Sequence, residues 1–299
     1  MRVLITGAAG YIGNAVAEEF RQAGHDVLGL IRSKEKSNGL LRKEITPLIG
    51  DLNTSSNILR DIEAADIVIH CAFDPTQPAA AEKPLLDAIA ERPPKLFIYT
   101  SGVWVAGNWG NEVITESTPC KPIDLVKWRR AHEEKVLNIN VPGKRMLVLR
   151  PGCVYGEGGG GDGGLTSMWF GSAKSGAIVY SGTGDNRWAM IHVRDLAHAY
   201  LLAAESDLTG KAINIVDDQR ATVKEMALAC AAAAAIPERI QSIGEEESYK
   251  RYGAFTQGLL IDQQVSNEEA RKLLGWSPAH KGFIDDVDKY YGSWLAYQS

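Results

Sequence analysis

The sequence lacks any run of apolar residues that approaches the roughly 18 needed to span a membrane. Its opening, MRVLITGAAG, is interrupted by glycine too early for a signal peptide, so we interpret it as the first strand of the fold. Its four cysteines are widely spaced and form no C-x-x-C pair. That spacing argues against a disulfide framework or a zinc site, and it favours free thiols in a reducing compartment. We therefore expect a cytoplasmic protein.

Clustered histidines and an excess of basic residues are also missing. His192 and His198 come nearest to each other among the six histidines, but no H-E-x-x-H or similar motif surrounds them, so no metal site is expected. The net charge of −5 argues against a nucleic-acid partner. What remains is 299 residues, 45% hydrophobic and 23% charged, which is typical of a globular protein with a substantial core.

Short apolar runs alternate with helical segments along the first half of the chain. Strands are expected at residues 2–6, 26–32, 45–52, 65–73, 95–102 and 145–156. Apolar residues at Ile12, Val16 and Phe20 predict a helix directly after the first strand, and a long helix is expected at 121–139. Such alternation predicts a parallel sheet with right-handed crossovers.

The texture changes after residue 155. Residues 156–164, GEGGGGDGG, are either a flexible loop or a mobile lid beside a substrate. Shorter elements follow. We predict a Rossmann-type doubly wound parallel sheet with a smaller C-terminal substrate-binding lobe. Residues 1–155 form the dinucleotide-binding domain, to which 187–216 returns, and 156–299 form mainly the substrate lobe.

Three glycines stand between the first strand and the first helix. Gly7, Gly10 and Gly13 occur in TGAAGYIG, where glycine permits a tight turn and lets the backbone approach a pyrophosphate at the helix N-terminus. A purely structural turn is the alternative. The position of the motif favours the dinucleotide-binding interpretation.

The end of the second strand predicts which dinucleotide binds. NAD-binding chains usually place an acid about 20 residues after the glycines, to accept a hydrogen bond from the ribose 2′-hydroxyl. Here Arg32, Ser33 and Lys34 occupy that region. Two cations and a hydroxyl suit a 2′-phosphate, so NADP(H) is preferred and NAD(H) is the second choice. A solvated basic loop is the alternative interpretation.

Together these motifs resemble the extended short-chain dehydrogenase/reductase superfamily, in its NAD-dependent epimerase/dehydratase branch, over nearly the whole chain. The resemblance continues through GDL, HCA, YTSGVWVAG, LRPGCVYG, WAMIHVRDLAHAYLLA and LLGWSP. It implies that the cofactor is bound by Gly7, Gly10, Tyr11, Ile12, Gly13, Asp51, Leu52, Cys71, Ala72, Phe73, Thr100, Pro151, Gly152 and Val154. Asp51 and Leu52 would flank the adenine, and Pro151, Gly152 and Val154 would lie near the nicotinamide.

The residues that carry the family's chemistry are replaced in this chain. The family uses a serine or threonine with a tyrosine and a lysine in Y-x-x-x-K, four residues apart on one helix face. In KPIDLVKWRRAHEEKVL, residues 121–137, these two positions fall on Val126 and Arg130, and no tyrosine lies between Ser101 and Val154. Arg130 can still hold the ribose hydroxyls, but a guanidinium does not donate its proton in proteins.

Two routes for the reaction remain. Another side chain can supply the proton, with Ser101, Lys127, His132 and Tyr155 as candidates. His132 has the alternative interpretation of an exposed or helix-capping residue. In the second route the substrate needs no protein acid, because hydride addition to an iminium or an activated double bond depends mainly on positioning and electrostatics.

Aromatic residues predict the nature of the substrate. Phe73, Trp104 and Trp188 indicate an apolar or aromatic molecule, although tryptophan is also a common core residue. Tyr180 and Arg187 are further substrate candidates. Trp128, with its neighbour Arg129, either grips a planar or anionic ligand or packs at a homodimer interface that the resemblance implies for this helix.

We therefore expect an NADP(H)-dependent oxidoreductase or epimerase-like enzyme that acts on a small molecule with a non-standard proton donor. The alternative is a catalytically silent NADP(H)-binding regulator or redox sensor. A sugar-nucleotide epimerase with the standard chemistry is disfavoured, because the tyrosine and the lysine are absent.

Overall fold

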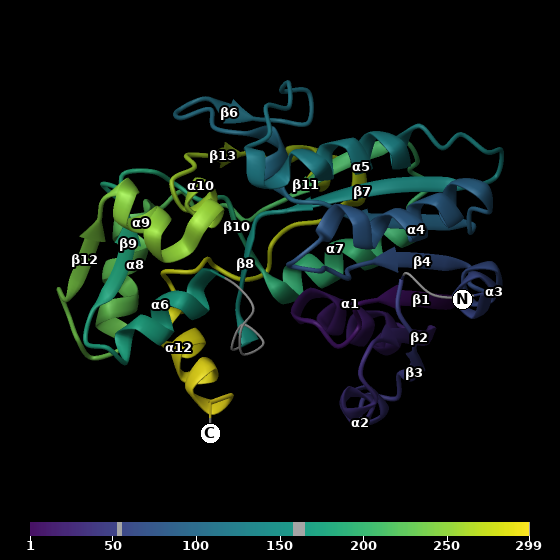
Figure 1. Ribbon diagram of the computed structural model, residues 1–299, viewed down its shortest axis with the longest axis horizontal. Helices are drawn as coiled ribbons and strands as arrows, with labels where there is room; N and C mark the ends of the chain where they lie inside the picture. The colour runs from purple at the N-terminus through teal and green to yellow at the C-terminus, as the bar shows by residue number, and fades with distance from the viewer. Residues whose placement is uncertain (53–55, 158–164, 299) are drawn as a thin grey trace.

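The computed structural model describes residues 1–52, 56–157 and 165–298 (Figure 1). Most of the glycine-rich stretch, residues 158–164, lies outside the described residues, so the loop and lid interpretations both stay predictions. Within the described ranges, no helix combines the length and the apolar character that crossing a membrane requires. All four cysteines are free thiols.

A seven-stranded sheet forms the centre of the larger lobe. Its order is β11-β7-β5-β4-β1-β2-β3, and each neighbouring pair is parallel. The strands are β1 (Arg2–Thr6), β2 (Asp26–Ile31), β3 (Thr46–Ile49), β4 (Ile67–His70), β5 (Leu96–Thr100), β7 (Arg145–Pro151) and β11 (Lys211–Ile215). This arrangement confirms the predicted Rossmann-type doubly wound parallel sheet.

Helices cover both faces of the sheet, because successive side chains of a strand point to opposite faces. Val3 and Ile5 of β1 pack in the core beneath α1 (Tyr11–Gln22) and α7 (Val193–Glu205). Leu4, between them, packs in the core beneath α3 (Ser56–Ala64), α4 (Pro78–Glu91) and α5 (Lys127–Leu137). Figure 1 shows the strands following one another from β11 and β7 at the top to β2 and β3 at the bottom, with the helices packed along them. Burial on both faces explains why the strands read as continuous apolar runs.

The remaining elements form a smaller lobe and short connections. The lobe has a separate core rich in aromatic residues, including Trp169, Phe170 and Trp188, and it lies on the left of Figure 1. It contains β8 (Cys153–Tyr155), α6 (Leu165–Ala173), β9 (Ile178–Ser181), β10 (Met190–His192), α8 (Val223–Ala233), β12 (Ile240–Ile243), α9 (Glu245–Tyr252), α10 (Thr256–Leu259) and α12 (Val287–Ala296). The connections include α2 (Ser37–Leu41), β6 (Val113–Ile114), β13 (Gln264–Val265) and α11 (Glu268–Leu274).

The strand expected at residues 145–156 is divided in two at Gly152. Strand β7 stays in the main sheet, whereas β8 leaves it and pairs with β10. A Cβ atom on Gly152 would lie 2.6 Å from the carbonyl oxygen of Ala189. Glycine therefore lets the two segments approach closely where the chain changes sheet.

The helix expected at residues 121–139 is shorter than predicted. Residues Asp124–Val126 form a 3₁₀ turn, and α5 begins only at Lys127. Just before it, the amide of Lys121 donates to the carbonyl of Ala106, which holds this part of the chain in a loop beside the end of β5. Val126 is thus the N-cap of α5 rather than a position within it.

Candidate cofactor site and active-site helix

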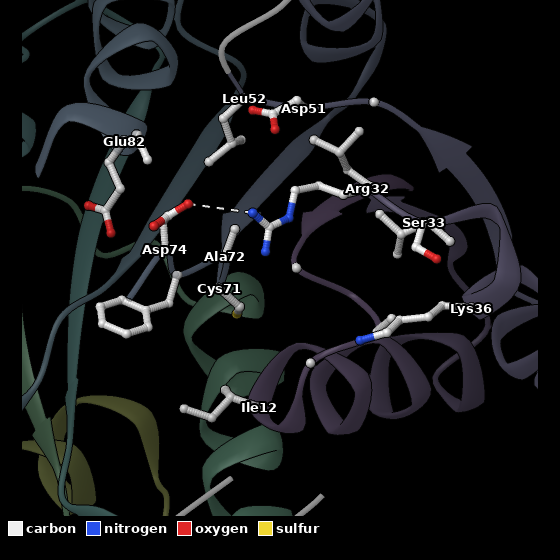
Figure 2. Close-up of a pocket in the computed structure, with 18 of the residues that line it drawn as sticks. Ile12, Arg32, Ser33, Lys36, Asp51, Leu52, Cys71, Ala72, Asp74 and Glu82 are labelled. Atoms are coloured by element: carbon white, nitrogen blue, oxygen red, sulfur yellow. Dashed lines mark hydrogen bonds and ion pairs between the residues drawn. The ribbon is translucent and has the colours of Figure 1, made fainter. Parts of the chain in front are cut away.

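A pocket of about 450 Å³ opens at the carboxyl ends of β1, β2 and β4 (Figure 2). The strand order reverses between β1 and β4, and open α/β sheets bind their ligands in the crevice at such a point. The predicted cofactor residues that line this pocket are Gly7, Gly10, Tyr11, Ile12, Arg32, Ser33, Asp51, Leu52, Cys71, Ala72 and Phe73.

The turn between β1 and α1 has room only for glycine at two positions. Gly7 has a φ of +70°, and a Cβ atom there would lie 2.7 Å from the Cα atom of Ala72. A Cβ atom on Gly13 would lie 2.3 Å from the carbonyl oxygen of Gly7. Gly13 is thus a packing residue of the turn, and the turn brings the start of α1 against the pocket.

The N-terminus of α1 suits an anionic group. Its N-cap is Gly10, which has no side chain to cap the first amides of the helix. Backbone N–H groups and the helix dipole together favour a phosphate at such an end. This glycine turn, called the cradle below, therefore fits the pyrophosphate of a dinucleotide. A purely structural turn would not need to leave these amides open to a ligand.

Cations from the chain after β2 line the other end of the pocket. Arg32 and Ser33 are among the lining residues, whereas Lys34 is not, and Lys36 takes part instead. Residues Lys34–Lys36 form a 3₁₀ turn, so the two lysines at its ends point in different directions and only Lys36 lines the pocket. Figure 2 shows Arg32, Ser33 and Lys36 on the same side of the cavity.

Phe73 and Glu82 line the pocket on the side of β4 and α4. The Phe73 side chain is 55% exposed, so its ring is open to a ligand in the pocket. Glu82 is almost completely buried, and its Oε2 atom accepts a 2.6 Å hydrogen bond from Tyr99. Burial raises the pKa of Glu82, but the hydrogen bond with His132 and the nearby His70 outweigh this and hold the pKa below its ordinary value.

The side chain of His132 binds the carboxylate of Glu82. Its Nδ1 atom lies 3.0 Å from Glu82 Oε2, and its ring packs edge-on against Trp128 and Tyr99. The residue therefore lies between α4 and α5. Its contacts join the two helices, which differs from the exposed interpretation, while its role as a proton donor stays a prediction.

Arg129, rather than its neighbour Arg130, reaches the end of β5. The Nη1 atom of Arg129 donates a 2.7 Å hydrogen bond to the backbone oxygen of Thr100, and its guanidinium lies 5.8 Å from the ring centre of Phe73. Arg130 instead pairs with Glu133 at 3.0 Å and Glu134 at 3.1 Å. Successive helix positions are rotated by about 100°, so only one of the two arginines can face this strand.

Glu133 fixes this register of α5. It is completely buried and accepts two hydrogen bonds from the buried Arg150 of β7, at 2.9 and 2.6 Å. Arg129 lies four residues before Glu133, one turn earlier on the same face. The buried ion pair thus indicates that position 129, and not 130, faces the sheet.

The other proton-donor candidates, Ser101, Tyr155 and Lys127, differ in burial and in hydrogen bonding. Ser101 is buried beside Thr100, and its hydroxyl has no hydrogen-bond partner in the described part of the chain. Tyr155 is completely buried and donates to Asp217 at 3.0 Å, and burial raises its pKa far above the ordinary value. Lys127 forms an exposed ion pair with Asp124.

Several substrate candidates lie in the core of the smaller lobe. Trp188 stacks on Trp169 with ring centres 5.1 Å apart, and Tyr180 is buried in the same core. Arg187 is bound by both oxygens of Asp262, at 3.1 and 3.0 Å. Trp104 packs against Phe255. These contacts give each of them a structural role.

The remaining predicted cofactor residues lie outside the pocket lining. Thr100 bonds through its hydroxyl to Tyr200 at 2.6 Å, while Pro151, Gly152 and Val154 lie where β7 passes into β8. Residues that sequence patterns missed are Lys36, Asp74 and Glu82. The sequence predicts Arg129 as a ligand candidate beside Trp128, but the position of the family's lysine falls on Arg130, because Glu134 competes with Glu133 as the glutamate four residues later.

The fold and the cradle define a Rossmann-type dinucleotide-binding protein. A family model, described as the NAD dependent epimerase/dehydratase family, matches residues 3–216. The chain belongs to this family. The predicted family, and with it the prediction of an NAD(P)-dependent enzyme, is therefore confirmed.

Known relatives cover nearly the whole chain. An uncharacterized protein of Schizosaccharomyces pombe is 30% identical over 97% of this chain and 100% of the relative. A protein named 3-diazoavenalumate denitrifying reductase, from a Streptomyces species, is 25% identical over 97% of this chain and 100% of its own. Among solved structures, the dTDP-glucose 4,6-dehydratase DesIV of Streptomyces venezuelae, crystallised with NAD and TYD, has a TM-score of 0.85 at 15% identity and covers 100% of this chain and 98% of its own.

Proposed function

We propose that the protein is an NADP(H)-dependent oxidoreductase that reduces a small apolar or aromatic molecule without a tyrosine proton donor. One observation carries this proposal: a glycine cradle and two cations, Arg32 and Lys36, line one pocket, while α5 presents Arg129 and no phenol. The four free thiols support work in a reducing compartment such as the cytoplasm.

Different pocket residues would bind different parts of the cofactor. The amides around Gly7 and Gly10 would hold the diphosphate, and Asp51 and Leu52 would flank the adenine. Arg32 and Lys36 would pair with the 2′-phosphate, because two cations on one side of the cavity match a dianion. When bound, NADPH supplies the hydride for the reduction.

Arg129 would act as a fixed positive charge at the reacting end. Its hydrogen bond to the Thr100 carbonyl orients the guanidinium next to Phe73. A guanidinium stabilises developing negative charge and orients hydroxyl groups, but it does not release a proton. The chain therefore suits a neutral substrate that is already electrophilic, such as an activated double bond, because hydride addition then develops negative charge beside the guanidinium and positioning provides most of the rate. The resulting enolate takes its proton from water. A relative named as a denitrifying reductase supports a reductive reaction of this kind.

Two tyrosines near the pocket, Tyr11 and Tyr99, are poorly suited to donate a proton to a substrate. Tyr11 lines the pocket, but its hydroxyl donates to the Gly156 carbonyl, and burial raises its pKa well above the ordinary value. Tyr99 is bound to Glu82, and burial likewise raises its pKa. The same observation favours the second candidate, a silent NADP(H)-binding regulator, which would bind the cofactor with no turnover.

Deuterium transfer from 4-deuterated NADPH separates these candidates. The assay compares electron-poor aromatic α,β-unsaturated substrates with simple ketones, and detects the label in the product by mass spectrometry. We expect transfer to the electrophilic series and none to the ketones. Efficient ketone reduction would contradict the proposal, and tight NADPH binding without transfer to any member of the panel would favour the regulator.

A further inference from the structure

Asp74 faces Arg32 across the mouth of the cofactor pocket. The two residues come from different elements, since Asp74 follows β4 and Arg32 follows β2, and both line the same cavity. Arg32 Nη1 lies 3.5 Å from Asp74 Oδ2, as the dashed line in Figure 2 marks. The pocket therefore carries a carboxylate and a guanidinium at the end where Lys36 also lies.

The carboxylate of Asp74 is held in place by its own loop. Its Oδ1 atom accepts hydrogen bonds from the Thr76 amide at 2.8 Å, the Thr76 hydroxyl at 2.6 Å and the Gln77 amide at 3.1 Å. These bonds, with the Thr76 hydroxyl as the largest contribution, lower the pKa of Asp74 to about 2. Asp74 is consequently ionised at neutral pH, and its Oδ2 atom is the one that faces the pocket.

The bond between Asp74 and Arg32 is easily exchanged for a ligand. It is long, and the Arg32 side chain is 65% exposed, whereas the Asp74 side chain is 28% exposed. Exposed ion pairs contribute little to stability, because water screens both charges. A phosphate or hydroxyl group that enters this end of the pocket can therefore replace either partner.

We propose that Asp74 is a specificity residue that supports NAD(H) and restrains the preference for NADP(H). Its carboxylate accepts the 2′-hydroxyl of NAD(H), which is the role of the acid that chains of this kind usually carry after the second strand. The same carboxylate repels the 2′-phosphate that Arg32 and Lys36 attract. The proposal rests on the proposed function in one respect, the binding of a nicotinamide dinucleotide in this pocket.

Sequence spacing alone would not reveal such a residue. The acid lies 42 positions after Arg32 and reaches the pocket only because β4 and β2 flank β1 in the sheet. Two opposed charges at the 2′ position predict a moderate preference rather than an exclusive one. The chain should therefore bind both dinucleotides.

The test compares the affinities of NADPH and NADH in the wild type and in Asp74→Asn. Dissociation constants come from fluorescence titration, so no turnover is needed. Asparagine keeps an oxygen for the Thr76 and Gln77 amides and removes the charge. We expect NADPH to bind about threefold to tenfold more tightly, and NADH about tenfold more weakly, as expected for the loss of a charge-assisted hydrogen bond.

Asp87→Asn is the matched control. It makes the same change in net charge on the exposed side of α4, where Asp87 pairs with Lys83 and Lys135. Its ratio of NADH to NADPH dissociation constants should equal that of the wild type. Asp74→Ser is the second variant: a hydroxyl can still accept a loop hydrogen bond, and the ratio should again rise.

The outcomes separate this inference from the proposed function. An unchanged ratio in both Asp74 variants overturns the inference, as does an equal loss of affinity for both dinucleotides, because that result marks a purely structural loop residue. Wild-type preference for NADH would overturn the preference assigned to Arg32, whereas a rise in the ratio on Asp74→Asn would still support Asp74.

Discussion

The substitution Gly13→Ala changes the stability of the protein through two effects of opposite sign. Gly13 lies in the first turn of α1, where alanine favours the helix by up to about 1 kcal/mol relative to glycine. The added methyl group, however, would lie 2.3 Å from the carbonyl oxygen and 2.8 Å from the carbonyl carbon of Gly7. These are backbone atoms of the cradle, which cannot rotate away as a flexible side chain would.

The overpacking should exceed the gain in helix propensity. Extra methylene groups in a packed interior cost about 1–3 kcal/mol, and contacts with backbone belong in the upper part of that range. We expect Gly13→Ala to lower the free energy of unfolding by about 1–2 kcal/mol in urea titrations. The displaced cradle should also weaken NADPH binding at least about tenfold, which equals about 1.4 kcal/mol.

Gly292→Ala is the matched control for this experiment. Gly292 lies in α12, and a Cβ atom there would meet nothing within 4 Å. This variant should gain up to about 1 kcal/mol of stability and bind NADPH as the wild type does. If Gly13→Ala were as stable as Gly292→Ala and kept wild-type affinity, the reasoning about the closed turn would be refuted.

The remaining predictions concern buried charges and the two arginines of α5. Glu133→Gln leaves the charge of Arg150 buried without its partner, and should cost about 3–5 kcal/mol of unfolding free energy in urea. Burial raises the pKa of Asp217 to about 7 from an ordinary value of 3.8, so the native state binds a proton that the unfolded chain has released. The stability of the wild type relative to Asp217→Asn should therefore fall as the pH rises from about 4 to 7, and level off above; a rise measured by urea titration would contradict this. Arg129→Gln should lower the rate of deuterium transfer at least about tenfold, whereas Arg130→Gln should change it little, and equal losses would show that the two arginines are not distinguished by the strand they face.

The sheet and the cradle could be predicted from the sequence because their signals are local. Strands buried on both faces read as apolar runs, and the glycines of the first turn are close together in the chain. The division of 145–156 at Gly152 could not be predicted in this way, since it depends on the approach of Ala189, a residue from another segment. The same is true of Asp74, which reaches Arg32 only through the order of the strands.

The register of α5 shows a second limit of prediction from the sequence. The chain offers two adjacent arginines and two adjacent glutamates, and spacing alone cannot choose between the two pairs. The choice depends on Arg150 of β7, which binds Glu133 and so directs Arg129 toward the sheet. A buried ion pair between distant segments is a property of packing rather than of pattern.

Equilibrium binding of NADPH and NADH to the purified wild-type protein tests the central proposal most directly. We predict saturable binding of both, with NADPH favoured, and a loss of that preference on Arg32→Gln, because the guanidinium lines the end of the pocket that would receive the 2′-phosphate. Absence of measurable affinity for either dinucleotide would contradict the proposed function as a whole.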